Sequence, residues 1–148
     1  MKSIFFSIVM LLGSMLVSNA VQAQQVGEKG AKIDFAKETH DYGDVKYGGN
    51  GTCTFKFKNT GNAPLIISKA EGSCGCTVPS WPKEPIAPGA SAEISVKYDT
   101  KRPGPISKSV TITSNAINEP TKVIKIKGTV GTAPENTTPV NNSGPGNN

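Results

Sequence analysis

Short segments in which apolar and polar residues alternate are the feature that most constrains the fold of this chain. Two segments alternate clearly, Thr52–Lys58 and Ala90–Tyr98. Their apolar sides consist of Cys53, Phe55 and Phe57 in the first and Ala92, Ile94, Val96 and Tyr98 in the second. A period of two residues with one apolar face is typical of a half-buried strand, so both segments are predicted to be strands.

The rest of the chain between residues 31 and 130 also favours short strands. Ile33–Phe35, Leu65–Ser68, Ile106–Ser114 and Thr121–Val130 are predicted strands, and Leu65–Ser68 is expected to be central because its start is apolar on both faces. Asp41–Val45 is expected to be a turn followed by an extended piece.

Turns rich in glycine, proline and asparagine separate these strands, and Gly48–Gly51 is the strongest turn signal. Four prolines make Pro79–Gly89 a poor strand. No helical period is visible. About seven short strands predict an all-β, immunoglobulin-like antiparallel sandwich, with a small barrel as the alternative.

The two ends of the chain differ in composition from this predicted domain. Residues 1–23 carry one charge, Lys2, then an apolar run from Ile4 to Val17 and small polar residues, which is typical of a signal peptide. That run is shorter than the roughly 20 residues that span a bilayer. Residues 131–148 are mostly Gly, Thr, Pro, Asn and Ser and are expected to be a disordered tail. The mature chain is therefore expected in the periplasm or outside the cell, without a membrane anchor.

The net charge of +5 does not indicate a nucleic-acid partner. The lysines are scattered along alternating strand positions, whereas a nucleic-acid surface needs a concentrated basic patch. We expect solvated strand faces and no nucleic acid among the partners.

The motif Cys74-Gly75-Cys76 holds two of the three cysteines and is the most unusual local feature. Thiols of exported proteins tend to pair. Cys53 could bridge to Cys74 or Cys76, Cys74 and Cys76 could bridge to each other across a glycine that permits a tight turn, or the two thiolates could bind a soft metal such as Cu(I). A structural role is favoured, because disulfides of small exported domains are usually scaffolding.

Three pieces of the sequence, in order, resemble a known family. They are Phe55–Leu65 (FKFKNTGNAPL), Cys74–Thr77 (CGCT) and Ile86–Gly89 (IAPG) leading into a strand. Together they resemble the exported bacterial family called domain of unknown function 1573, over roughly residues 33–130. The resemblance implies an immunoglobulin-like fold similar to major sperm protein and pilus-chaperone domains, and it implies no established activity. The family's pattern has no cysteine at the position of Cys53.

No catalytic constellation is visible in the sequence. The chain has one histidine, His40, and no serine lies in Gly-x-Ser-x-Gly, so a serine hydrolase is not indicated. We expect no enzyme, no cofactor and no metal. The leading hypothesis is a non-enzymatic binding or structural module for an unknown protein or cell-envelope partner, with Trp81 and Thr77 as candidate binding-surface residues. The alternatives are a thiol-redox or copper-binding protein using the Cys-Gly-Cys loop, and a periplasmic chaperone-like domain that binds strands.

Overall fold

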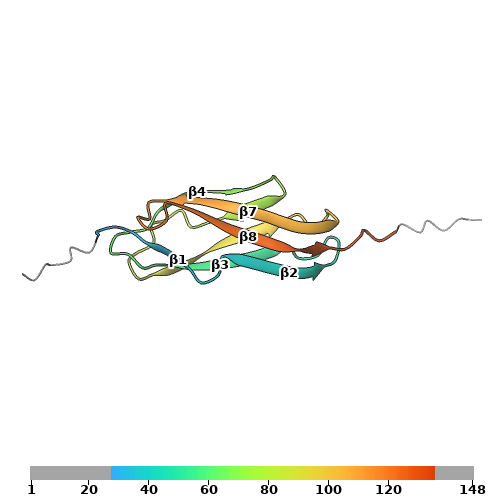
Figure 1. The fold of residues 1–148 in the computed structure, drawn as a ribbon, viewed down its shortest axis with the longest axis horizontal. Coiled ribbons are helices and arrows are strands. Elements are labelled where there is room, and N and C mark those ends of the chain that lie inside the picture. The colour runs from blue at the N-terminus through green and yellow to red at the C-terminus, as the bar shows by residue number, and fades with distance from the viewer. Residues whose placement is uncertain (1–27, 136–148) are drawn as a thin grey trace, which may run out of the picture.

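A computed structural model describes residues 28–135 as a sandwich of two β-sheets (Figure 1). The predicted signal peptide lies outside the described residues, and so does the predicted tail from residue 136 onward. The strands are β1 (Ile33–Phe35), β2 (Thr39–Val45), β3 (Thr52–Asn59), β4 (Ile67–Gly72), β5 (Thr77–Ser80), β6 (Ser91–Tyr98), β7 (Gly104–Ser114) and β8 (Thr121–Val130). Within the described part of the chain, no helix has the length and apolar character needed to cross a membrane.

The strand order is that of an immunoglobulin-like sandwich, which confirms the predicted fold class. One sheet has the order β1-β3-β6-β5 and the other β2-β8-β7-β4. The first strand of such a fold is divided here, because β1 pairs with β3 and β2 then pairs with β8 in the opposite sheet. The chain keeps its direction when it changes sheets, so β2 runs parallel to β8. Among the eight strands of residues 28–135, that pair is the one that is parallel, and an isolated parallel bridge also joins Ala31 and Ala116.

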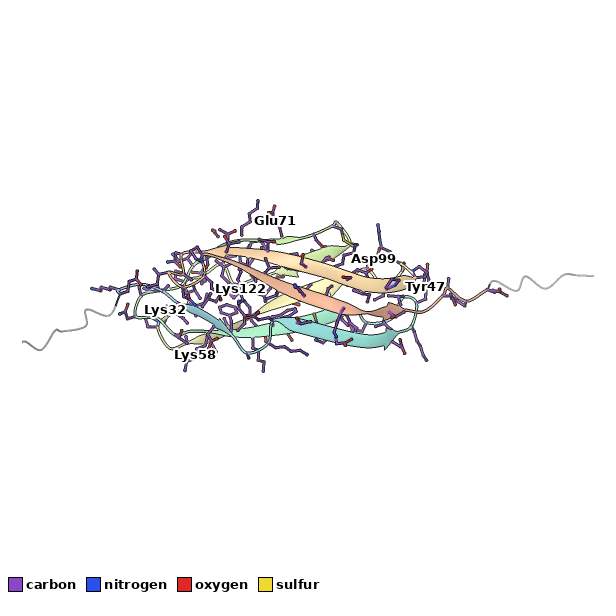
Figure 2. The ribbon with its side chains drawn as sticks, in the orientation of Figure 1. Lys32, Tyr47, Lys58, Glu71, Asp99 and Lys122 are labelled. Atoms are coloured by element: carbon purple, nitrogen blue, oxygen red, sulfur yellow. A yellow bond between two sulfur atoms is a disulfide. The ribbon has the colours of Figure 1, made fainter. Side chains whose placement is uncertain are left out.

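The core lies between the sheets and uses the residues that the alternation indicated. In β3 the odd-numbered positions are buried and the even-numbered ones exposed, and β6 buries Ile94, Val96 and Tyr98. The rings of Phe35 and Phe57 pack at 5.4 Å between centroids. Charged side chains project outward, and Figure 2 shows Lys58 and Glu71 on opposite faces of the sandwich.

Two local predictions were wrong, and a third, that Pro79–Gly89 is a poor strand, holds except at its first two residues. Thr39–Val45 is a strand with a register shift between Asp41 and Asp44, where Asp41–Val45 was expected to be a turn followed by an extended piece. β4 begins at Ile67 and lies at the edge of its sheet, and Ile66 is 44% exposed, so this segment is not central. β5 contains Pro79, which an edge strand tolerates because a residue facing away from the sheet needs no amide donor.

Asn59, at the end of β3, is fully buried and ties together the turn that follows. Its side-chain oxygen accepts hydrogen bonds from the amides of Gly61 (3.0 Å) and Lys32 (3.3 Å). Its side-chain nitrogen donates to the carbonyls of Ala63 (2.8 Å) and Ile86 (2.9 Å). One side chain therefore satisfies four backbone groups from three separate segments.

His40 of β2 should make the stability of the fold depend on pH. Its ring packs against Tyr42 (4.6 Å) and Phe55 (6.5 Å). Burial, followed by the charge of Lys37, lowers the pKa of His40, and Asp41 opposes this shift. The unfolded chain then binds a proton at a higher pH than the folded one, so stability is lost as pH falls through the range just below 6.5.

Urea unfolding at pH 7.5 and pH 5 should therefore show a higher midpoint at pH 7.5. A His40→Gln variant should lose that part of the difference. An unchanged difference in the variant would assign the effect to other groups.

Candidate functional site

The Cys-Gly-Cys motif forms the connection between β4 and β5, which are edge strands of opposite sheets. The loop, residues 73–76, is held by backbone hydrogen bonds on both sides. The amide of Ser73 donates to Ser109 of β7 (2.8 Å), and the carbonyl of Cys76 accepts from Asp99 after β6 (2.9 Å). The loop thus joins the two layers at one edge of the sandwich.

Cys74 and Cys76 are bonded to each other, with their Cα atoms 5.2 Å apart. Cys76 is 6% exposed and belongs to the core, whereas Cys74 is partly buried and packs against the core from outside. Thr77 follows at the start of β5 and is 2% exposed. Its Oγ1 lies 3.6 Å from the sulfur of Cys74 and 3.8 Å from that of Cys76.

Cys53 is bonded to neither of these cysteines, so the alternative in which Cys53 bridges to Cys74 or Cys76 is wrong. It is a buried free cysteine on β3, opposite Val96 of β6. Burial raises the pKa of the Cys53 thiol, which keeps it protonated and unreactive. The nearby Tyr42 hydroxyl donates to the carbonyl of Gly51 (2.7 Å) and has a raised pKa because of its burial. Cys53 is therefore a small core residue.

The two residues proposed for a binding surface, Thr77 and Trp81, are more buried than such a role requires. Thr77 is buried, because the odd-numbered side of β5 at this point faces the core, so it offers no binding surface. Trp81 is partly buried, and its indole nitrogen donates to the carbonyl of Ile67 (3.2 Å). The amino group of Lys83 lies 3.0 Å above the ring of Trp81. Trp81 thus secures the start of β4.

A hollow of about 820 Å³ lies beside the disulfide loop. Three parts of the chain form its wall. They are the turn before β3, the disulfide loop with β5, and the end of β6 with the turn that follows. The lining residues are Gly48, Gly49, Asn50, Gly51, Thr52, Gly75, Cys76, Val78, Lys97, Tyr98, Asp99, Thr100 and Lys101. Val78 is 59% exposed. Figure 2 shows Tyr47 and Asp99 at the same end of the sandwich, which locates this hollow.

Sequence reasoning missed this hollow. Gly48–Gly51 was recognised as a turn, but nothing in its residues indicates that it faces the loop. The hollow follows from strand pairing that the sequence does not reveal. β6 pairs with β3 on one side and with β5 on the other, which places Thr52 and Val78 on the two sides of Lys97.

The described residues offer few side chains that could bind a metal ion together. No group of three or more His, Cys, Asp or Glu side chains in residues 28–135 is arranged to hold an ion. The sulfurs of Cys74 and Cys76 are bonded to each other, and it is the thiolate that binds Cu(I).

Comparisons with known proteins give a family and a fold. A family model described as "Protein of unknown function (DUF1573)" matches residues 33–130. No curated protein matches the chain.

Several solved structures are similar to the chain in fold. A protein of unknown function from Porphyromonas gingivalis W83 is 18% identical with a TM-score of 0.61, over 68% of this chain and 47% of that one. The seventh PapD-like domain of human CEP192 is 11% identical with a TM-score of 0.56, over 71% and 89%. The VesB protease of Vibrio cholerae is 13% identical with a TM-score of 0.52, over 68% and 32%. The chain thus spans about half the length of the Porphyromonas protein, and at these identities the likeness concerns the fold.

Proposed function

The chain belongs to the family described as protein of unknown function DUF1573, which assigns no activity, and we propose from the site itself that the domain is a thiol–disulfide exchange protein. It would act outside the cytoplasm, in the periplasm or the extracellular space, on thiols of another exported protein. The signal-peptide pattern of residues 1–23 supports that location, as does the disulfide, because disulfides persist in oxidising compartments.

The pairing of Cys74 with Cys76 is the observation that carries this proposal. In the chain-entropy model, a bridge that closes a loop of three residues stabilises a fold by only about 1.6 kcal/mol. A bridge from Cys53 to Cys74 would contribute about 3 kcal/mol in the same model. The observed bridge therefore stabilises the fold only weakly, and a bridge of little structural value with one partly exposed end, at Cys74, is suited to reversible exchange.

The exchange itself needs no further group. A partner thiolate attacks one sulfur, a mixed disulfide forms, and the other cysteine leaves as a thiolate. A second thiol of the partner then attacks the mixed disulfide and releases the first cysteine. The partner dithiol loses two electrons and two protons and becomes a disulfide, while Cys74 and Cys76 gain them. The reduced domain can run the same steps in reverse with a partner disulfide.

The test uses the purified mature domain and a reduced peptide that contains two cysteines. Wild-type protein should oxidise about one equivalent of peptide and become reduced, as measured by mass spectrometry after alkylation. A Cys74→Ala/Cys76→Ala variant should oxidise none, and its fold should survive because the bridge is a weak staple. Cys53→Ala is the matched control and should behave as wild type, since Cys53 is unpaired and buried. Peptide that stays reduced with the wild type contradicts the proposal.

A binding module without chemistry is the second candidate. The hollow beside the exposed Val78 favours it, because binding sites are usually concave and partly apolar. Capture of a partner's strand by β5 is disfavoured, because Pro79 offers no amide donor to an added strand. In the peptide experiment, this candidate predicts no oxidation by any variant.

A further inference from the structure

We propose that Thr77 is the positioning residue of the exchange site, where its hydroxyl stabilises the sulfur of Cys76 as the departing thiolate. This inference rests on the proposed exchange function and assigns separate roles to the two cysteines. Cys74 is the sulfur that the partner attacks, and Cys76 is the sulfur that leaves.

The hydrogen bonding of Thr77 is the first observation. Thr77 is 2% exposed as a residue, so its hydroxyl needs a hydrogen-bond partner inside the protein. Among residues 28–135, the partners of Thr77 Oγ1 are the two sulfurs, at 3.6 and 3.8 Å. The sulfurs of a disulfide carry no hydrogen, so the hydroxyl must be the donor.

The strength of this hydrogen bond changes with the redox state of the cysteines. A disulfide sulfur is a weak acceptor, whereas a thiolate carries a full charge, and hydrogen bonds to charged groups are about twice as strong as neutral ones. The Thr77 hydroxyl therefore stabilises the reduced, ionised state more than the bridged state. The backbone fixes this geometry, because the amide of Thr77 donates to the carbonyl of Cys74 (3.1 Å).

The difference in burial between the two cysteines assigns their roles. Cys74 is only partly buried and is therefore the residue that a thiolate of another protein can reach more readily, whereas Cys76 is 6% exposed. Attack at Cys74 forms the bond between the partner's sulfur and Cys74 Sγ and breaks the bond between the two cysteines. The electron pair leaves on Cys76 Sγ, inside the protein, where a charge is costly without a hydrogen-bond donor. Thr77 supplies that donor.

Two lysines offer a competing explanation for stabilisation of a thiolate. Lys97 and Lys101 line the same hollow as Cys76, together with one carboxylate, Asp99. Both lysines are exposed, so salt screens their influence, whereas salt does not screen a hydrogen bond from a buried hydroxyl. Measurements at low and high salt separate the two effects.

The experiment compares the wild-type mature domain with Thr77→Val and Thr77→Ser. Valine keeps the volume and removes the hydroxyl, and serine restores it. Equilibration in glutathione redox buffers should show Thr77→Val shifted about tenfold toward the disulfide, which is about 30 mV in a two-electron couple. Alkylation of the reduced proteins by iodoacetamide, followed from pH 5 to 10, should shift to higher pH in Thr77→Val. Thr77→Ser should resemble wild type in both measurements, at 50 mM and at 500 mM salt.

The outcomes distinguish this inference from the exchange function. If wild type and Thr77→Val give the same glutathione equilibrium and the same alkylation profile, Thr77 has no positioning role, even where the wild type still oxidises the peptide. If the wild type oxidises no peptide, the exchange function fails, while the alkylation profiles of the chemically reduced proteins still decide the role of the hydroxyl. Thr77→Ala is the second hydroxyl-free variant if Thr77→Val does not fold.

Discussion

An Asn59→Ala variant is expected to lose about 3–5 kcal/mol of unfolding free energy, the largest effect of any single substitution considered for this domain. The side chain of Asn59 is fully buried and bonds four backbone groups at 2.8–3.3 Å. Alanine leaves those groups without their side-chain partner at a site that is buried at Ile86 and part-buried at the other three groups. A domain of this size typically has 5–15 kcal/mol of stability, so the loss is a large share of the total.

Equilibrium urea unfolding measures this loss, when one slope of unfolding free energy against urea concentration is fitted to wild type and variant together. Asn115→Ala is the matched control, because Asn115 also bonds two backbone groups, the amide of Ile66 (2.8 Å) and the carbonyl of Pro64 (3.0 Å), but on the surface. Water can replace those bonds, so the control should cost about 1 kcal/mol. Equal losses in the two variants would show that burial of Asn59 is not what makes it important.

A Gly72→Ala variant is expected to lose about 2–3 kcal/mol and to displace the disulfide loop. A Cβ atom at Gly72 would overlap the backbone carbonyl of Thr77, because β4 and β5 approach each other closely at this point. Backbone atoms cannot rotate away as a side chain can, so the two strands must separate. That separation moves Thr77 relative to the two sulfurs.

Gly75→Ala is the control for the same loop. No heavy atom lies within 4 Å of the Cβ position of Gly75, and its backbone is not in the left-handed region. This glycine, expected to permit a tight turn, occupies a position where a side chain also fits. Alanine at position 75 should leave the stability unchanged or raise it by up to about 1 kcal/mol. Urea unfolding of both variants tests the pair, and a loss at position 75 that matches the loss at position 72 would refute the overlap as the cause.

The sequence was a good guide to the strands that bury one face. Phe55, Phe57, Ile94 and Val96 fall at alternate positions, and a strand pattern with period two leaves one arrangement in which all of them reach the core. The turn residues around these strands then limited the fold to a sandwich or a small barrel. The resemblance to a known family agreed with this fold class, and the match of the family model confirms the family over residues 33–130.

The sequence was a poor guide where pairing between distant strands decides the outcome. Ile66 and Ile67 are equally apolar, yet Ile66 is 44% exposed because β4 lies at a sheet edge. β2 contains His40, Asp41 and Gly43, which resemble a turn, and it is a strand because β8 offers it a partner. The cysteine pairing depends on the same long-range geometry, since Cys53 lies on β3 and the other two cysteines on the loop between β4 and β5.

The division of the first strand between the two sheets also determines how the domain carries a mechanical load. The described chain enters at one end of the long axis and leaves at the other, with β2 and β8 side by side and parallel (Figure 1). A pull between the two ends draws these strands past each other along their length. Their hydrogen bonds are then loaded together in shear rather than opened one after another. We therefore expect the β2–β8 pair to raise the force at which the domain unfolds when it is pulled along its long axis.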